Sequence, residues 1–132
     1  MTWDKVTDKR IKTLDPRIQG DVEDFINEVE MTLGIYLRVS QARRTKEEQD
    51  AFYAQGRTKP GKIITWVKGG KSWHNYGLAI DIVEIKNKKA IYNTNYVRIV
   101  PLAKKRGFEW GGDWPKKKRD KPHFQKTFGQ KI

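Results

Sequence analysis

The absence of cysteine is the feature that most restricts this 132-residue chain. Without disulfides, a hydrophobic core must hold the fold together, and a chain of this length can bury one. Without thiolates, any metal must be held by histidine and carboxylate side chains, and the sequence has only two histidines. No repeat, low-complexity tract or linker divides the chain. We therefore expect residues 1–132 to form one domain, with no separate binding module.

The first half of the chain shows clear helix and strand signals. Apolar residues three and four positions apart predict a helix over residues 15–33. The run 35–39 is rich in β-forming residues and predicts a strand. Thr45 followed by Glu48 is typical of a capping box, which starts a second helix that runs to Gln55.

The second half is predicted to alternate loops, short strands and one helix. A long loop over 57–71, marked by proline and glycines, surrounds a short apolar piece at 63–67. The remaining elements are a hairpin of strands 78–85 and 90–92, a helix at 96–105, and short pieces at 108–110 and 123–125. Helices and strands mix without a regular βαβ alternation. We therefore expect an α+β fold with a small antiparallel sheet flanked by helices.

The charge of the chain indicates an anionic partner without identifying it. The net charge is +12 and the pI is about 9.9. Such a field attracts nucleic acid, acidic lipid surfaces or an acidic cell-wall polymer. No apolar run reaches the ~20 residues of a membrane span, and no secretory apolar segment follows Met1. We expect a protein without a membrane span, made in the cytoplasm without a signal peptide.

The segment 72–81 contains the first of two groups of residues that could bind a metal or take part in catalysis. His74 is predicted to lie in a loop and Asp81 in the following strand. Gly77 between them lets the chain bend back, so that imidazole and carboxylate can meet. Both are ordinary zinc ligands. On this segment alone, a hydrogen-bonded structural pair is the more common explanation.

A second group near the C-terminus strengthens the case for a metal. Asp120 precedes His123, the other histidine of the chain, by three residues. Together with His74 and Asp81, His123 completes three protein ligands and leaves the fourth position of a tetrahedral zinc for water, as a hydrolytic site requires. Asp120 is then left over as a base. A turn brings residues three apart to within about 7 Å at their Cα atoms.

These residues match a known family. Ser-x-His-x-x-Gly-x-Ala-x-Asp at 72–81, with Asp-x-x-His at 120–123, resembles the zinc D-alanyl-D-alanine carboxypeptidases and L-alanyl-D-glutamate peptidases. That family includes phage endolysins, cell-wall endopeptidases and VanY-like vancomycin-resistance carboxypeptidases. The segments 54–61 and 110–114 are similar to its L-alanyl-D-glutamate branch, and the resemblance runs from about residue 39 to 125.

The resemblance implies a Hedgehog/D,D-peptidase-like fold and a definite set of roles. One zinc ion would be held by His74, Asp81 and His123, with Asp120 as the general base. Many relatives have glutamate at the base position, and aspartate is one methylene shorter. Arg44 matches the arginine that binds the substrate carbonyl or carboxylate and steadies the oxyanion.

Further residues in or near the motif leave alternatives open. Arg43 stands beside Arg44 and could take its role. Ser72 is expected to contact substrate or to orient the His74 loop. Trp110 is a candidate for the wall of a substrate cleft, as are Trp73, Tyr76 and Trp114, although core packing is the more common use of any one of these residues.

The function expected from this resemblance is hydrolysis of peptidoglycan stem peptides, at the L-Ala-D-Glu bond. The enzyme would be a monomeric, antimicrobial, endolysin-like bacteriophage protein for host cell lysis, acting on the wall after release and lacking a wall-binding domain. One alternative is a D-Ala-D-Ala carboxypeptidase with the same zinc ligands. Another is a basic nucleic-acid-binding module with structural histidines. The basic clusters contain no recognition helix or aromatic RNA-binding motif, and an anionic wall polymer explains the charge equally well, so we expect no nucleic acid partner.

Overall fold

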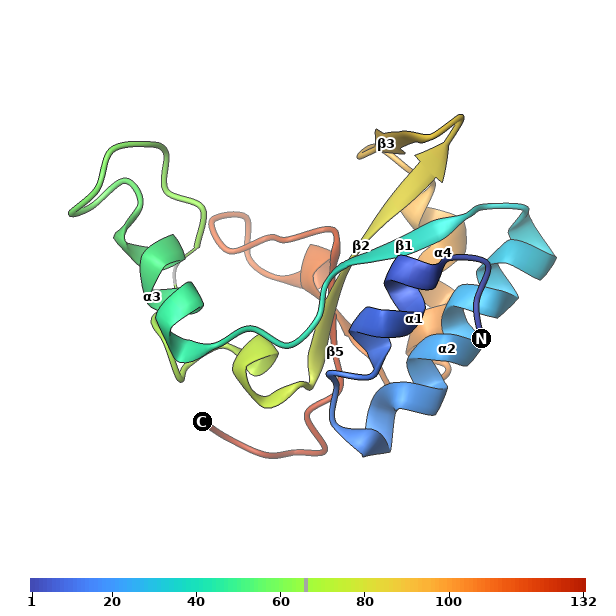
Figure 1. Cartoon of the computed structure of the whole chain (residues 1–132), viewed down its shortest axis with the longest axis horizontal. Helices are drawn as coiled ribbons and strands as arrows, with labels where there is room; N and C mark the ends of the chain where they lie inside the picture. Colours follow the sequence, from blue (N-terminus) through green and yellow to red (C-terminus); the bar gives the residue numbers. More distant parts are fainter. Residues whose placement is uncertain (66) are drawn as a thin grey trace.

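The computed structural model describes residues 1–65 and 67–132. The elements, in chain order, are α1 (Lys5–Ile11), α2 (Pro16–Leu33), β1 (Leu37–Gln41), α3 (Lys46–Ala54), the 3-10 turn η1 (Trp73–Tyr76), β2 (Ala79–Lys86), β3 (Lys89–Ile91), α4 (Tyr96–Lys104), β4 (Glu109–Trp110), the 3-10 turn η2 (Gly111–Asp113) and β5 (His123–Gln125) (Figure 1). Among these described residues, no helix is long and apolar enough to cross a membrane.

All strand pairs of the sheet are antiparallel. The strand order is β1-β2-β5-β4, and β3 pairs with β2 as a hairpin. Asp81 near the start of β2 lies directly opposite His123 of β5. On the other side of β2, the pairing with β1 shifts between Val39 and Gln41, and Gln41 also lies opposite Asp81. One end of the sheet thus gathers residues from three strands.

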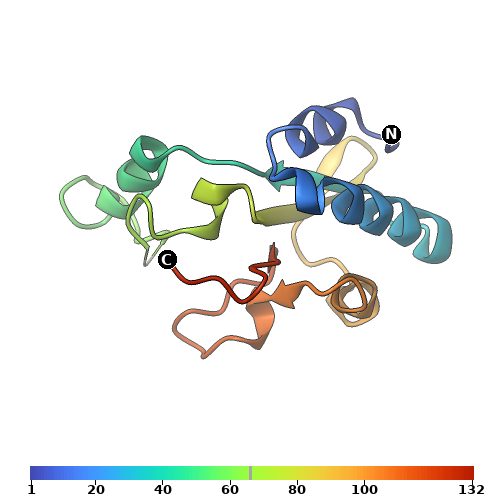
Figure 2. The ribbon, with the colours of Figure 1, turned by 90° about the horizontal axis from the view of Figure 1, so that it is seen from below.

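The core lies between the sheet and three of the four helices. Helices α1, α2 and α4 group on one side of the strands, whereas α3 and the loop after it lie on the other (Figures 1 and 2). Phe25 of α2 packs against Phe124 of β5 and Phe108, with ring centroids 5.6 and 6.4 Å apart. Strand β5 is therefore fixed from the helix side, while its opposite face is available for a site.

Local sequence signals account for two of the helices. Asp15 caps the start of α2 by accepting a hydrogen bond from the Arg17 amide, and Gly34 ends it in the left-handed region at φ 67°. Thr45 and Glu48 form the expected reciprocal capping box of α3. These helices and the α+β arrangement confirm the predictions made from the sequence.

Two local predictions need correction. Strand β1 spans Leu37–Gln41 rather than 35–39, because pairing with β2 and not β-propensity sets its bounds. Helix α1 was not predicted, since it buries only Thr7 and Ile11 and has no apolar stripe. The apolar piece expected at 63–67 includes Trp66, which lies outside the described residues.

Helix α1 is held by polar contacts around one buried carboxylate. Asp4 caps the helix by accepting from the amide and hydroxyl of Thr7. The same carboxylate pairs with Arg38 of β1 through two hydrogen bonds of 2.8 and 3.0 Å. The pKa of Asp4 is lowered because these bonds outweigh the burial that alone would raise it. This pair ties α1 to the sheet.

Candidate active site

His74 is held by a short capped turn before β2. The Ser72 side chain accepts a hydrogen bond from the His74 amide, and Asn75 completes a capping box. Gly77 ends the turn at φ 70°, where a Cβ would come within 2.7 Å of the Asp15 amide nitrogen, so only glycine fits. Ser72 therefore orients the His74 loop, one of the two roles expected of it, and it also lines the adjoining cleft.

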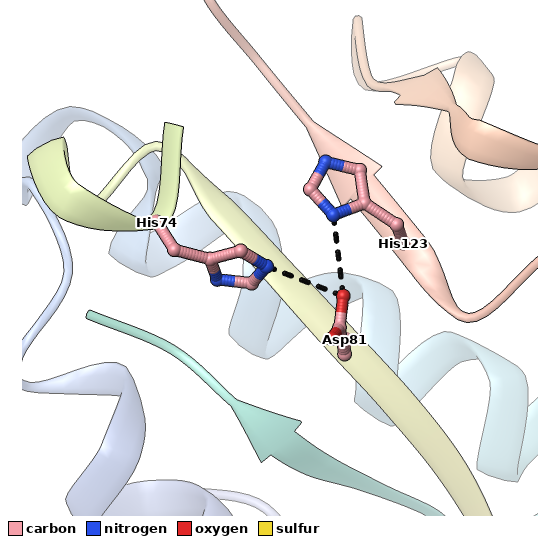
Figure 3. Close-up of side chains that lie close together, drawn as sticks. All are labelled: His74, Asp81 and His123. Atoms are coloured by element: carbon pink, nitrogen blue, oxygen red, sulfur yellow. Dashed lines mark hydrogen bonds and ion pairs between the residues drawn. The ribbon is translucent and has the colours of Figure 1, made fainter. Parts of the chain in front are cut away.

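Three side chains from separate elements converge on one point. His74 comes from η1, Asp81 from β2 and His123 from β5 (Figure 3). His74 Nε2 lies 3.3 Å and His123 Nδ1 lies 3.2 Å from the same oxygen, Asp81 Oδ1. One potential ligand atom from each residue lies within 4.8 Å of the other two. The structure thus brings together the three residues proposed from the sequence as metal ligands.

The hydrogen bond made by His74 Nδ1 determines the protonation state of Nε2, the ring nitrogen that faces Asp81. His74 Nδ1 lies 2.8 Å from the backbone carbonyl oxygen of Ala42. A carbonyl oxygen only accepts, so Nδ1 carries a hydrogen and donates it. In the neutral ring, Nε2 then presents a lone pair to Asp81.

The same reasoning applies to His123 through a longer chain. Gln125 Nε2 donates to Glu109 Oε2 at 2.9 Å, and this contact sets the orientation of the Gln125 amide. Gln125 Oε1 therefore faces His123 Nε2 at 2.8 Å and accepts its hydrogen. In the neutral ring, His123 Nδ1 also presents a lone pair to Asp81.

Two lone pairs and a carboxylate oxygen facing one another are unfavourable unless a positive charge lies between them. Without such an ion, protonation of the rings is the alternative: the charged imidazoles hold the pKa of Asp81 far below its usual range, although burial alone would raise it. Burial opposes charge on His123 as well, yet Asp81 raises the pKa of the ring. Two imidazole nitrogens and one carboxylate oxygen are a donor set that a divalent transition metal favours. The residues present therefore fit a metal ion.

Asp120 lines the same cleft as these three residues. Its amide donates to Gly111 O at 3.0 Å, and its carbonyl accepts from the His123 amide at 3.2 Å. A Cβ on Gly111 would come within 2.3 Å of Asp120 O, so the turn requires glycine. Burial first, and then the charge of Asp81, raise the pKa of Asp120, against the opposing effects of His123 and other cationic groups.

Arg44 lies just after β1 and turns its guanidinium toward the cleft. Nη1 donates to Gln49 Oε1 at 2.6 Å, and the guanidinium carbon lies 4.8 Å from the centre of the Phe52 ring. Nη2 lies 3.9 Å from Asp81 Oδ2, while Nε is buried and has no hydrogen-bond partner among the described residues. Burial lowers the pKa of Arg44, and the nearby carboxylates oppose this effect. The side chain is a fixed cation beside the candidate metal centre.

Arg43 has a different position and role. Its Nε donates to Thr13 O at 2.8 Å, and its Nη atoms donate to the Asn75 and Tyr76 carbonyls at 3.4 Å. It joins three loops on the outside of the protein and is not among the described residues that line the cleft. This arrangement favours Arg44 over Arg43 for contact with substrate.

The cleft has a volume of about 770 Å³. Its walls are partly apolar and its rim is basic, with Phe52, Ile64, Trp73 and Trp114 on the walls and Lys71, Lys118 and Arg119 on the rim. Trp114 lies over His123, with ring centroids 5.0 Å apart.

Trp110, expected from the sequence to contact substrate, is not among the described residues that line this cleft. Its ring stacks on Tyr96 at 6.0 Å and its Nε1 donates to Lys121 O at 2.7 Å. Its place in the structure is therefore that of a packing residue beside the core. Among the described tryptophans, Trp73 and Trp114 line the cleft, and Trp114 is the one that packs against His123.

Sequence reasoning did not single out two amides of this region. Gln49 is 1% exposed and bonds Arg44, Thr65 and the Val67 carbonyl. Gln125 stands two residues after His123 in a strand, so the period of two placed it on the same face. That spacing was the available signal. For Gln49, the available indication was a polar residue on the face of a short helix that is turned toward the protein.

Comparison with known proteins finds similarity to peptidoglycan-cleaving enzymes. The profile of a family described as D-alanyl-D-alanine carboxypeptidase matches residues 66–126. The chain is 43% identical over 103 residues to the peptidoglycan L-alanyl-D-glutamate endopeptidase CwlK of Bacillus subtilis (strain 168), covering 70% of this chain and 61% of that protein. It is 34% identical over 96 residues to the L-alanyl-D-glutamate peptidase of Listeria phage A118, covering 70% and 31% respectively. The chain thus spans less than two thirds of either relative.

Solved structures share the fold. The L-Ala D-Glu endopeptidase ChiX of Serratia marcescens matches with a TM-score of 0.63 at 21% identity, covering 97% of this chain and 91% of that one. VanYB in complex with D-alanine-D-alanine matches with a TM-score of 0.65 at 25% identity, covering 86% and 71%. A vancomycin resistance D,D-pentapeptidase VanY variant in complex with Zn(II) gives 0.63 at 22%, covering 86% and 72%.

Proposed function

We propose that this chain is a zinc-dependent endopeptidase of the family described as D-alanyl-D-alanine carboxypeptidase, and that it hydrolyses the L-Ala-D-Glu bond of peptidoglycan stem peptides. The observation that carries this proposal is the convergence of His74, Asp81 and His123, whose lone pairs face one point in a cleft. The relatives named for this bond support the substrate, and the VanY complex with Zn(II) supports the metal.

The three ligands would hold one zinc ion at the floor of the cleft. When bound, zinc lowers the pKa of a water molecule and polarises a scissile carbonyl. Asp120 takes the proton from the attacking water and passes it to the leaving amine. A base works best when its pKa lies near the operating pH, and burial moves the pKa of Asp120 in that direction. Arg44 stabilises the negative charge that forms on the carbonyl oxygen.

The surroundings of the site suit an acidic peptide substrate. The rim carries Lys71, Lys118 and Arg119, and stem peptides carry free carboxylates. The net charge of +12 would also concentrate the enzyme on anionic wall polymers. We propose a monomeric enzyme of endolysin type that acts on the cell wall, and the phage relative supports this context.

A D-Ala-D-Ala carboxypeptidase is the second candidate. VanYB in complex with D-alanine-D-alanine shares the fold at a TM-score of 0.65, and the same three ligands would serve that reaction. The two activities differ in their products. An endopeptidase separates L-Ala from D-Glu, whereas a carboxypeptidase releases free D-Ala.

The decisive experiment is digestion of purified peptidoglycan, followed by mass spectrometry of the new termini. New L-Ala carboxyl and D-Glu amino termini are expected. Release of D-Ala alone would favour the second candidate, and no new terminus would remove both. In parallel, elemental analysis should find about one zinc per chain, lost in His74→Ala and His123→Ala. Full zinc and activity in His74→Ala would show that the ligand set is wrong.

A further inference from the structure

We propose that Gln125 and Glu109 are positioning residues that fix the ring of His123 and thereby strengthen metal binding. Neither contacts the point where the ligand atoms converge. The Gln125 side chain donates to the Glu109 carboxylate, and its carbonyl oxygen accepts from His123 Nε2, the ring nitrogen that faces away from Asp81. The inference rests on the proposed function in one respect, since it takes His123 as a ligand.

The sheet register places these residues together. Glu109 of β4 lies directly opposite Gln125 of β5, and His123 stands two residues before Gln125 on the same face. On its other side, Gln125 lies opposite Ala79 of β2, whose small side chain leaves room for the amide. Gln125 is 7% exposed, so water does not readily replace its partners.

Only one assignment of hydrogens satisfies the whole chain. If the Gln125 amide were turned over, its carbonyl oxygen would face the Glu109 carboxylate at 2.9 Å, and two acceptors would repel. Its NH₂ group would then face His123 Nε2, and the ring would have to present its hydrogen toward Asp81. The Glu109 carboxylate therefore determines which nitrogen of His123 is free for a metal.

The two histidines differ in this respect. The outer nitrogen of His74 donates to a backbone carbonyl, that of Ala42, which no substitution removes directly. The outer nitrogen of His123 depends on side chains alone. Removing a group that orients a metal-binding histidine typically weakens metal affinity by about 10–100-fold.

The test compares three variants of the full chain by zinc affinity. Gln125→Leu removes the acceptor for His123 and should raise the zinc Kd by about 10–100-fold. The double substitution Glu109→Gln with Gln125→Glu reverses donor and acceptor yet retains both hydrogen bonds, so its Kd should stay within about threefold of wild type. Glu84→Gln replaces a strand glutamate paired with Leu37 and Ile91, outside the site, and should leave the Kd unchanged.

Competition with a chromophoric chelator gives the zinc Kd, and the absorption spectrum of the cobalt-substituted protein reports the ligand geometry. In Gln125→Leu the cobalt bands should shift, and in the double variant they should return. A Gln125→Leu protein that melts at lower temperature but keeps its zinc Kd and cobalt spectrum would overturn the proposal, because the amide would then only pack the sheet. So would a double variant as weak as Gln125→Leu.

His123→Ala separates this outcome from failure of the proposed function. If His123→Ala retains zinc, the ligand set is wrong and the proposed function fails with it. If His123→Ala loses zinc while Gln125→Leu binds it as wild type does, the ligand set stands and only the role of Gln125 and Glu109 is refuted.

Discussion

Replacing Arg44 by glutamine should separate catalysis from metal binding. In the structure, the Arg44 guanidinium lies 3.9 Å from a carboxylate oxygen of Asp81. At that distance two unit charges interact by about 4 kcal/mol at an effective dielectric constant near 20. An anion forming on a substrate carbonyl at a comparable distance would receive stabilisation of this order. Loss of one oxyanion donor typically costs about 2.7–4 kcal/mol, or 10²–10³ in kcat.

The same substitution should leave metal binding intact or strengthen it. A cation beside the candidate centre repels a second cation, so its removal does not weaken zinc affinity. Gln49 loses one of its hydrogen bonds in the process, which should lower the melting temperature slightly. We therefore expect Arg44→Gln to bind one zinc with an unchanged or lower Kd while kcat on a soluble stem peptide falls by about 10²–10³.

Arg43→Gln is the matched control. It removes an adjacent arginine that bonds the carbonyls of Thr13, Asn75 and Tyr76. This variant should lose stability, visible in its melting temperature, and keep kcat at temperatures where it is folded. If Arg43→Gln lost the turnover and Arg44→Gln kept it, the assignment of the oxyanion contact to Arg44 would be refuted.

Four further predictions follow from other contacts. Asp120→Asn should keep zinc and fold but lose about 10²–10⁴ in kcat, as expected for loss of a general base, and a fully active zinc-loaded variant would refute that role. Gly111→Ala should reduce activity and zinc content together, because its Cβ would displace the Asp120 carbonyl; atomic absorption with a rate assay checks this. Asp4→Asn should lower the free energy of unfolding at pH 7 by about 1–2 kcal/mol, measured by denaturant titration. Since the folded pKa of Asp4 is lowered, this difference should be present above the unfolded value near 3.8 and vanish as pH falls through the folded pKa. Binding to whole walls should weaken as salt rises, because charges are screened within about 8 Å at physiological ionic strength, whereas cleavage of a short soluble peptide should change little.

The sequence predicts those elements of the fold whose signals are local. Helix α2 carries its own cap and apolar spacing, and α3 carries a capping box, so their starts follow from neighbouring residues. Helix α1 has a cap at Asp4 but no apolar spacing, and the contact of Asp4 with Arg38, 34 residues away, ties it to the sheet. The start of β1 depends in the same way on its pairing with β2. Long-range partners of this kind leave no periodic pattern in the sequence.

In the candidate site as well, the residues with a local sequence signal were predicted and those placed by long-range packing were not. The spacing of His74 and Asp81 around Gly77 and the second histidine at His123 were sufficient to propose a ligand set that the structure brings together. Which of the candidate aromatic residues line the cleft was not predictable: Trp73 and Trp114 do, and Trp110 is not among the described lining residues. The turn at η2 directs Trp110 onto Tyr96 and leaves Trp114 beside His123, and residue type alone does not distinguish the two.

The register of two strands specifies the core and the candidate metal centre together. Asp81 and His123 lie opposite each other on one face of the sheet, while Ile80 and Phe124, also opposite each other, are fully buried on the other face. A slip of β5 by one residue against β2 would turn His123 into the apolar core, expose Phe124 and leave Asp81 without His123 opposite it. The hydrophobic burial that stabilises the correct register therefore also places two ligands within reach of one ion. A chain without cysteine thus builds its candidate metal centre on the pairing of β2 with β5.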